Sequence, residues 1–276
     1  MKSKSIVYSF AFLLIAAFTA CDNEKNDTGF GRFVVKITDE PFPYDLLQEA
    51  NVTINKIEVR ESTEDEGSPF LVLSEEEVTL NLLELTNGIT ETLVDIEVPA
   101  GEYDLVRLYV KDASVLLTDG REFDLTVPSG AQTGIKVFIE PSIVVSGELT
   151  SELLLDVDLS SSFVVQGDPG TPAGINGFIF TPVVRATNLS NAGRLSGIVT
   201  NAEGVALEGA QISVFVADTL YTTSFTGETG QYGLIGLEPN LYTVSASLRG
   251  YVTNQVNEVE IVAGNETTLD FEMQEE

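Results

Sequence analysis

Histidine and tryptophan are absent from this 276-residue chain, and cysteine occurs once, at position 21. A single cysteine excludes an internal disulfide, and zinc would have to bind without its usual nitrogen and sulfur ligands. Without histidine, a serine or threonine nucleophile also lacks its commonest base. No Gly-x-Ser-x-Gly, Ser-x-x-Lys or phosphate-binding Gly-x4-Gly-Lys motif occurs after Cys21. We therefore predict no catalytic residues, no metal site and no cofactor, and only hard cations with oxygen ligands stay open.

Basic residues are scarce. The chain has 14 lysines and arginines against 43 aspartates and glutamates, which gives a formal net charge of −29. Such a surface repels phosphate backbones and anionic headgroups, so we predict that the protein binds no nucleic acid and does not bind lipid headgroups directly.

Only the first residues contain a long apolar run, from Ile6 to Phe18, and it follows Lys2 and Lys4. Its length is below the ~20 residues that a membrane-spanning helix needs, and it is typical of an export signal. Thr19-Ala20-Cys21 resembles a bacterial lipoprotein box, which implies that Cys21 carries lipid at the mature N-terminus. The alternative is a plain secretory signal followed by an unrelated free cysteine. We expect a signal peptide over residues 1–20 and a lipidated tether over residues 21–28.

The tether is acidic between Asp22 and Asp27. This segment resembles the signal that sends some lipoproteins to the outer face of the outer membrane, and its alternative is an ordinary flexible tether. The predicted location is therefore the outer membrane, through lipid on Cys21, with exposure at the cell surface as one option.

Beyond the tether, short segments of alternating apolar and polar residues are separated by Gly, Pro, Asn and Asp, which indicates an all-β chain. Phe33, Val35 and Ile37 share one strand face, and Leu153, Leu155, Val157 and Leu159 form the clearest alternating strand. Helical turns are expected only at residues 44–50 and 82–85. Small and polar residues predominate near residue 190, which indicates a domain boundary. We therefore predict two β-sandwich domains over residues 29–189 and 194–276, joined by a linker over 190–193. The second domain should hold strands at residues 195–200, 210–216, 220–225, 231–235, 241–248, 251–260 and 267–273.

Asp156 and Asp158 lie on the outward face of the strand that ends at Leu159. A calcium loop that starts at Asp156 fails because Ser161 and Gly167 stand where Gly and Glu are required. Paired catalytic carboxylates normally come from different elements of a cleft, so we assign no catalytic role to this pair.

Five blocks of the first domain resemble the DUF4382 family of bacterial lipoproteins, which implies an Ig-like or transthyretin-like sandwich on a lipid anchor and brings no known activity. The blocks are residues 37–41 (ITDEP), 82–88 (LLELTNG), 99–103 (PAGEY), 127–134 (VPSGAQTG) and 182–186 (PVVRA).

The second domain resembles the carboxypeptidase regulatory-like domain, a transthyretin-like sandwich grouped with carbohydrate-binding-like folds. The matching blocks are residues 195–200 (LSGIVT), 209–210 (GA), 227–232 (GETGQY), 237–242 (LEPNLY) and 250–251 (GY). Tyr232, Tyr242 and Tyr251 belong to this pattern, so packing is the favoured role for each.

Tyr221 and Phe225 lie outside the pattern and are the candidate ligand contacts. Asp218-Thr219-Leu220 resembles a bacterial O-glycosylation triplet, which makes Thr219 a candidate for modification. The predicted function is a non-catalytic, lipid-anchored binding or adhesion protein of the cell envelope, with a glycan or a surface protein as partner. The alternative is a structural or assembly component, such as a fimbria-like subunit or a partner of an outer-membrane complex.

Overall fold

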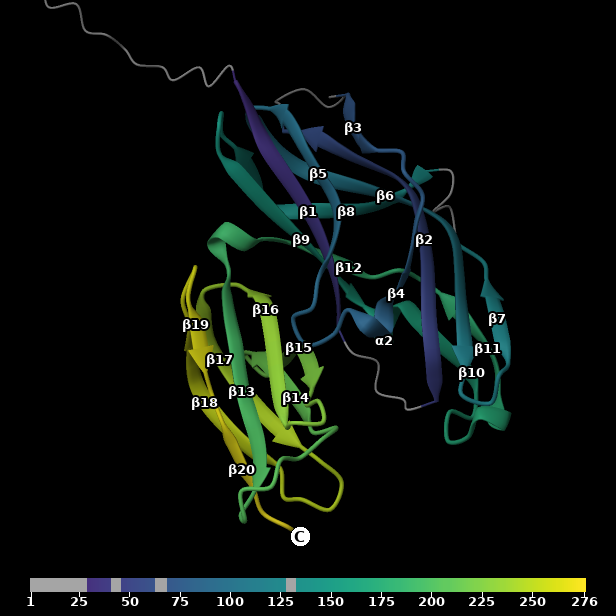
Figure 1. The fold of residues 1–276 in the computed structure, drawn as a ribbon, viewed down its shortest axis with the longest axis vertical. Helices are drawn as coiled ribbons and strands as arrows, with labels where there is room; N and C mark the ends of the chain where they lie inside the picture. Colours follow the sequence, from purple (N-terminus) through teal and green to yellow (C-terminus); the bar gives the residue numbers. More distant parts are fainter. Residues whose placement is uncertain (1–28, 41–45, 63–68, 128–132) are drawn as a thin grey trace, which may run out of the picture.

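Strands make up most of both halves of the chain (Figure 1). The structure, a computed structural model, describes residues 29–40, 46–62, 69–127 and 133–276. The predicted signal peptide, the tether and Cys21 therefore lie outside the described residues.

Within the residues that the structure describes, the first domain has twelve strands and three short helical segments. They are β1 (Phe30–Glu40), β2 (Leu47–Glu61), β3 (Phe70–Ser74), β4 (Val78–Asn81), η1 (Leu82–Glu84), β5 (Glu91–Pro99), β6 (Gly101–Leu117), β7 (Glu122–Leu125), β8 (Ile135–Val145), β9 (Thr150–Asp158), α2 (Leu159–Ser162), β10 (Phe163–Gly167), η2 (Pro172–Gly174), β11 (Ile175–Phe180) and β12 (Val184–Asn188).

Ten of these strands form one continuous sheet in the order β3-β2-β6-β8-β12-β9-β1-β5, with β4 added to β2 and β7 to β6. The two ends of this path, β3 and β5, contact each other, so the sheet curls around and its two halves face across one core. Strands β10 and β11 form a separate antiparallel hairpin.

Alternating apolar residues build the core of this curled sheet. Phe33, Val35 and Ile37 of β1 and Leu153 and Leu155 of β9 are at most 1% exposed and belong to the same cluster. The sequence prediction is confirmed for β1 and for Leu153, Leu155 and Val157 of β9, because only one face of each β-strand can point into the core. The strand ends earlier than predicted, because Leu159 begins α2.

One of the two predicted helical turns forms. Leu82–Glu84 is a turn of 3-10 helix in which Asn81 accepts a hydrogen bond from the backbone N–H of Leu83. The turn expected at residues 44–50 is wrong for residues 47–50, which begin β2, because Leu47 and Ala50 pair with Leu117 and Val115 of β6.

The second domain is a sandwich of two sheets around its own core. It follows η3 (Leu189–Asn191) and contains β13 (Gly193–Asn201), β14 (Gln211–Val216), β15 (Thr219–Phe225), β16 (Gln231–Leu237), β17 (Asn240–Ser247), β18 (Asn254–Ile261), β19 (Glu266–Thr268) and β20 (Phe271–Met273). One sheet has the order β16-β13-β19, with β20 also on β13, and the other has the order β15-β14-β17-β18. The predicted all-β architecture of two sandwich domains is confirmed, although the predicted last strand is split into β19 and β20.

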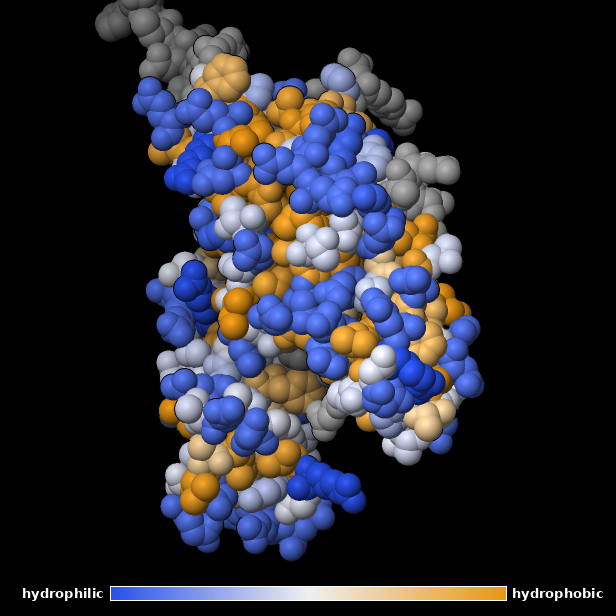
Figure 2. Space-filling view, turned by 45° about the vertical axis from the view of Figure 1, so that its right-hand side comes forward, coloured by the Kyte–Doolittle hydropathy of each residue, from blue (hydrophilic) through white to orange (hydrophobic). Residues whose placement is uncertain are grey.

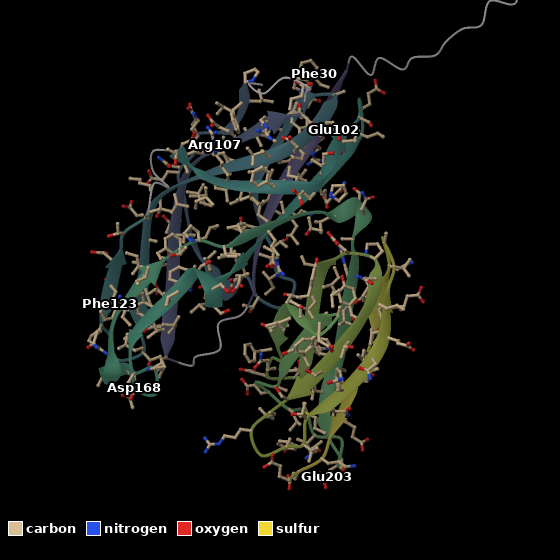
Figure 3. The ribbon with its side chains drawn as sticks, turned by 180° about the vertical axis from the view of Figure 1, so that it is seen from behind. Phe30, Glu102, Arg107, Phe123, Asp168 and Glu203 are labelled. Carbon is tan, nitrogen blue, oxygen red and sulfur yellow. The ribbon has the colours of Figure 1, made fainter. Side chains whose placement is uncertain are left out.

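The second domain extends the molecule along its long axis and lies beside the lower part of the first domain (Figure 1). Phe30 is at the free end of the first domain, and Glu203 is at the far end of the second (Figure 3). Hydrophilic side chains cover much of the face in Figure 2, which is notched between the second domain and the lower part of the first. None of the helices in the described residues is long and apolar enough to cross a membrane.

Candidate functional site

The turn at Asn87 and Gly88 reaches from the first domain to the second. Both residues have positive φ angles, 58° and 77°, a conformation that Asn and Gly adopt more readily than other residues. The end of β1 holds this turn in place, because the Thr38 hydroxyl lies 2.9 Å from the Leu85 carbonyl oxygen and 2.8 Å from that of Ile89.

The turn packs against β15 and β16 at a seam between the domains. The Ser224 hydroxyl donates to the Asn87 side-chain oxygen at 2.6 Å and lies 3.3 Å from the Gly233 carbonyl oxygen. A Cβ atom on Gly233 would lie only 3.0 Å from the Asn87 carbonyl oxygen. The seam leaves a cavity of about 20 Å³, room for about one water molecule, so it is a packed interface.

An ion pair of the first domain lies beside this turn and contacts the second domain. Arg185 of β12 donates to the Asp156 carboxylate at 2.7 Å and to the Tyr221 carbonyl oxygen, and its guanidinium lies 5.1 Å from the centre of the Tyr221 ring. Burial raises the pKa of Asp156, and the opposite charge of Arg185 counteracts part of this effect. The ion pair itself joins β12 and β9 of the first domain, and Arg185 carries the contact across the seam to Tyr221 of the second domain.

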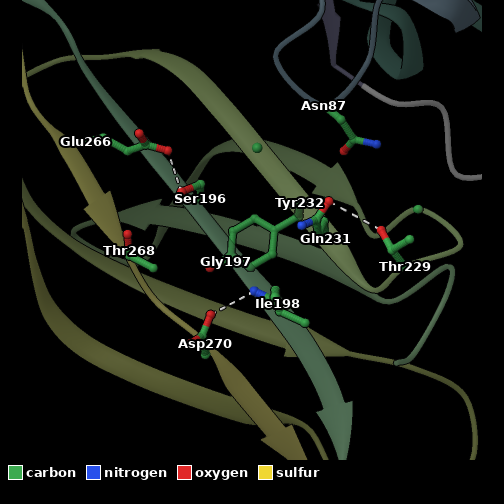
Figure 4. A pocket seen from close by; sticks show the side chains of 12 residues that line it. Asn87, Ser196, Gly197, Ile198, Thr229, Gln231, Tyr232, Glu266, Thr268 and Asp270 are labelled. Atoms are coloured by element: carbon green, nitrogen blue, oxygen red, sulfur yellow. Dashed lines mark hydrogen bonds between the residues drawn. The ribbon is translucent and has the colours of Figure 1, made fainter. Parts of the chain in front are cut away.

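A larger groove begins at the same turn and extends over the outer face of the β16-β13-β19 sheet (Figure 4). It has a volume of about 680 Å³. Asn87 of the first domain borders one end, and the other lining side chains come from β13, β16, the preceding loop and the segment 266–270. They include Ser196, Ile198, Thr229, Gln231, Glu266, Thr268 and Asp270.

The groove offers hydrogen-bonding groups and two carboxylates. Glu266 accepts from the Ser196 hydroxyl at 2.6 Å, and Asp270 accepts from the Ile198 N–H at 2.9 Å, which fixes both carboxylates (Figure 4). The lining contains no basic residue, and its one aromatic residue, Tyr232, is 4% exposed. Anions are repelled here, whereas neutral hydroxyl groups can both donate to and accept from the lining.

The structure does not bring the predicted ligand contacts into this groove. Tyr221 is half-buried in the seam, with its ring edge-on to Tyr242 at 5.6 Å, and Phe225 is half-buried at the end of β15, opposite Gln211. A ligand role for either residue stays a prediction. Tyr232 and Tyr242 are core residues, which confirms the packing role expected for these two.

Thr219 is exposed at the β14–β15 hairpin, where Ala217 and Asp218 have φ angles of 47° and 67°. Its side chain is accessible, and its modification stays a prediction.

The two aspartates of β9 have different environments. Asp158 accepts from the Ser161 N–H at 2.8 Å and caps α2. Asp156 faces the second domain, which covers the outer face of β9 at this point. The strand pattern cannot show such a neighbouring domain. Within the described residues, no group of three or more acidic or cysteine side chains could hold a metal ion.

Sequence reasoning missed the groove residues Gln231, Glu266 and Asp270, and it assigned Asn87 only to a turn. The alternation of Glu266, Thr268 and Asp270 was the one available signal, because residues two apart on an extended segment share a face.

Two protein-family models match the chain, in the order expected from its motifs. The model described as "Domain of unknown function (DUF4382)" matches residues 30–182, more than half of the chain. The model of the carboxypeptidase regulatory-like domain matches residues 194–274. None of the curated proteins matches the chain.

Several solved structures are distantly similar. The Bacillus anthracis TIE protein is 16% identical, with a TM-score of 0.26 over 90% of this chain; the chain spans only 34% of that protein. The shaft pilin SpaA of Lactobacillus rhamnosus GG is 9% identical, with a TM-score of 0.27 over 90% of this chain and 98% of the pilin. GBS52, a minor pilin of Streptococcus agalactiae, is 11% identical, with a TM-score of 0.25 over 88% of this chain and 96% of the pilin. TM-scores this low carry no argument about function.

Proposed function

This chain belongs to the DUF4382 family and has a carboxypeptidase regulatory-like domain on the C-terminal side of the matched region, and we propose that it is a lipid-anchored, non-catalytic binding protein of the cell envelope. Its ligand is a neutral, hydroxyl-rich molecule, with a glycan as the first class to test. The observation that carries this proposal is the polar groove on the outer face of the β16-β13-β19 sheet.

The chemistry of the groove selects against anionic glycans. Glu266 and Asp270 lie along one side and no cation lies in the lining, so uronic acids and phosphorylated sugars meet like charge. Gln231, Thr229 and Asn87 offer amide and hydroxyl groups to a neutral sugar. The groove lining has no exposed aromatic ring on which a sugar could stack. We therefore expect the affinity for a glycan to be low and to rise with the number of hydroxyl groups that the lining contacts.

The position of the groove suits a tethered protein. Phe30, the first strand residue, and the C-terminus lie at opposite ends of the long axis (Figures 1 and 3). Lipid on Cys21 would therefore attach the first domain to the membrane and present the second domain away from it.

The anchor and the ligand need separate experiments. Cys21→Ser should move the protein from the membrane to the soluble fraction, and continued membrane retention would refute the lipid anchor. For the ligand, residues 22–276 are applied to a glycan array with and without calcium. We expect selective binding of neutral glycans that weakens in Gln231→Ala and persists in Gln255→Ala, a matched change on β18, which does not line the groove. Binding that both variants retain would remove the groove from the proposal, and hydrolysis of any glycan or peptide would overturn the non-catalytic role.

One observation favours the alternative role in assembly. Among the described residues, β10 pairs with β11 alone, it contains no charged residue, and Val164 is 48% exposed. An uncharged edge strand is a template for strand addition. If the array shows no binding, crosslinking on intact cells should capture partners at Val164.

A further inference from the structure

The four edge strands of the two sheets of the second domain, β15, β16, β18 and β19, differ in charge. β15 and β16 are the edges of its two sheets nearest the first domain, and neither contains a charged residue. The opposite edges carry carboxylates: Glu258 and Glu260 on β18, and Glu266 on β19. Glu258 also has a φ angle of 58°, beside a register shift between β17 and β18. Charges and bulges are common protections of exposed strand edges against pairing with other chains.

The uncharged edges are covered by the first domain. Thr222, Thr223 and Ser224 of β15 are at most 7% exposed although they lie on an edge strand. The first domain lines the opposite side of the seam with Thr38, Asp39, the Asn87–Gly88 turn and Asp156. Residues 233–235 of β16 line the seam beside β15, on the side of the second domain.

Small residues make this cover close-fitting. A Cβ atom on Gly236 of β16 would lie 2.7 Å from Leu154 of β9, and one on Gly88 would lie 3.3 Å from Ile235. The two domains therefore approach each other closely at Gly236, Gly88 and Gly233. No space is left for an added strand along this part of the seam.

We propose that the first domain is a built-in cap on the β15 and β16 edges, held by the Asn87–Gly88 turn, and that a second domain released from this cap pairs through these edges with a second copy of the chain. The occupant is another copy because each released chain presents the same uncharged edges, and strands of the same kind can pair about a two-fold axis. The outer edges keep their carboxylates and stay closed to pairing. This inference does not depend on the groove or its ligand.

The test uses residues 22–276, which contain no cysteine. Thr118→Cys in the first domain and Glu203→Cys in the second, both exposed positions, carry spin labels whose distance reports docking. Gly233→Val should push the Asn87 turn away, whereas the control Gly227→Val has no heavy atom within 4 Å of its added Cβ. Light scattering measures the association state of the same samples.

We expect Gly233→Val to lengthen the distance between the labels within a chain and to shift the protein from monomer to dimer or higher species, while Gly227→Val changes neither. Adding Thr223→Lys to Gly233→Val should restore the monomer with the domains still apart, since a lysine on β15 disfavours strand pairing. Association by unfolded chains would not respond to this single charge. The proposal is overturned if Gly233→Val leaves the labels docked, if separated domains stay monomeric, or if Thr223→Lys fails to restore the monomer.

Discussion

The seam and the groove both begin at Asn87 but have opposite construction. In the seam, Ser224 is 1% exposed, its hydroxyl bonds to Asn87, and the remaining cavity is about 20 Å³. In the groove, about 680 Å³ is open and Glu266, Thr268 and Asp270 are exposed. The difference teaches that polar residues at a domain boundary serve stability where they are paired and buried, and are available for binding where they face solvent.

The Arg185–Asp156 pair of the first domain, which faces the seam, gives the largest expected effect. Arg185→Met leaves the Asp156 carboxylate buried without this partner, and removing one member of a buried pair costs about 3 kcal/mol or more. We expect the lower end, because 35% of the Arg185 side chain and 19% of that of Asp156 are exposed. Urea unfolding at neutral pH measures the loss. Arg32→Met, which breaks an exposed pair with Asp95, should leave the midpoint nearly unchanged, and equal losses in both variants would contradict a special role for the seam.

Ser224→Ala tests the hydrogen bond between the domains. The substitution removes the donor to the half-buried Asn87 side chain, and losing such a hydrogen bond costs about 0.5–1.5 kcal/mol. The same unfolding measurement applies, with Ser196→Ala in the open groove as the matched control. If Ser196→Ala destabilises the protein as much as Ser224→Ala does, the contrast between seam and groove is wrong.

Titration of the Asp156 carboxyl should make the free energy of unfolding depend on pH. Burial raises the pKa of this carboxyl in the folded protein, so the native state binds its proton more tightly than the unfolded state does. The resulting stability is present below the unfolded pKa and is lost as pH rises through the folded pKa. Asp156→Asn cannot ionise, so relative to the parent chain it should be most favourable at neutral pH and lose this advantage in acid. A pH series of urea midpoints measures this difference, and a constant difference between the two chains would contradict the assignment.

The groove should show the smallest effect on stability. Glu266→Gln keeps the size of the side chain and an acceptor for Ser196, at a position exposed to solvent, so the unfolding midpoint should stay within experimental error. The variant should instead reduce the discrimination of the groove against anionic glycans on the array. A large loss of stability would show that Glu266 has a structural role.

Strands and turns could be predicted well from the sequence, because alternation and turn signals depend only on residues that are close together in the chain. The alternation of Phe33, Val35 and Ile37 identifies a core face by itself, and Asn87-Gly88 indicates a turn with positive φ angles. The helical turn expected at residues 44–50 was wrong where β2 begins, because long-range pairing with β6 overrides local preference there.

The sequence by itself determined the all-β class, the order of the two domains, the core faces of β1 and β9 and the acidic composition. Only the tertiary structure decided what each outward-facing residue does. Asp156 and Asp158 have the same position in the strand pattern, yet one lies under a second domain and the other caps a short helix. Alternation along a strand tells which face a side chain occupies, and the packing of distant segments decides what covers that face.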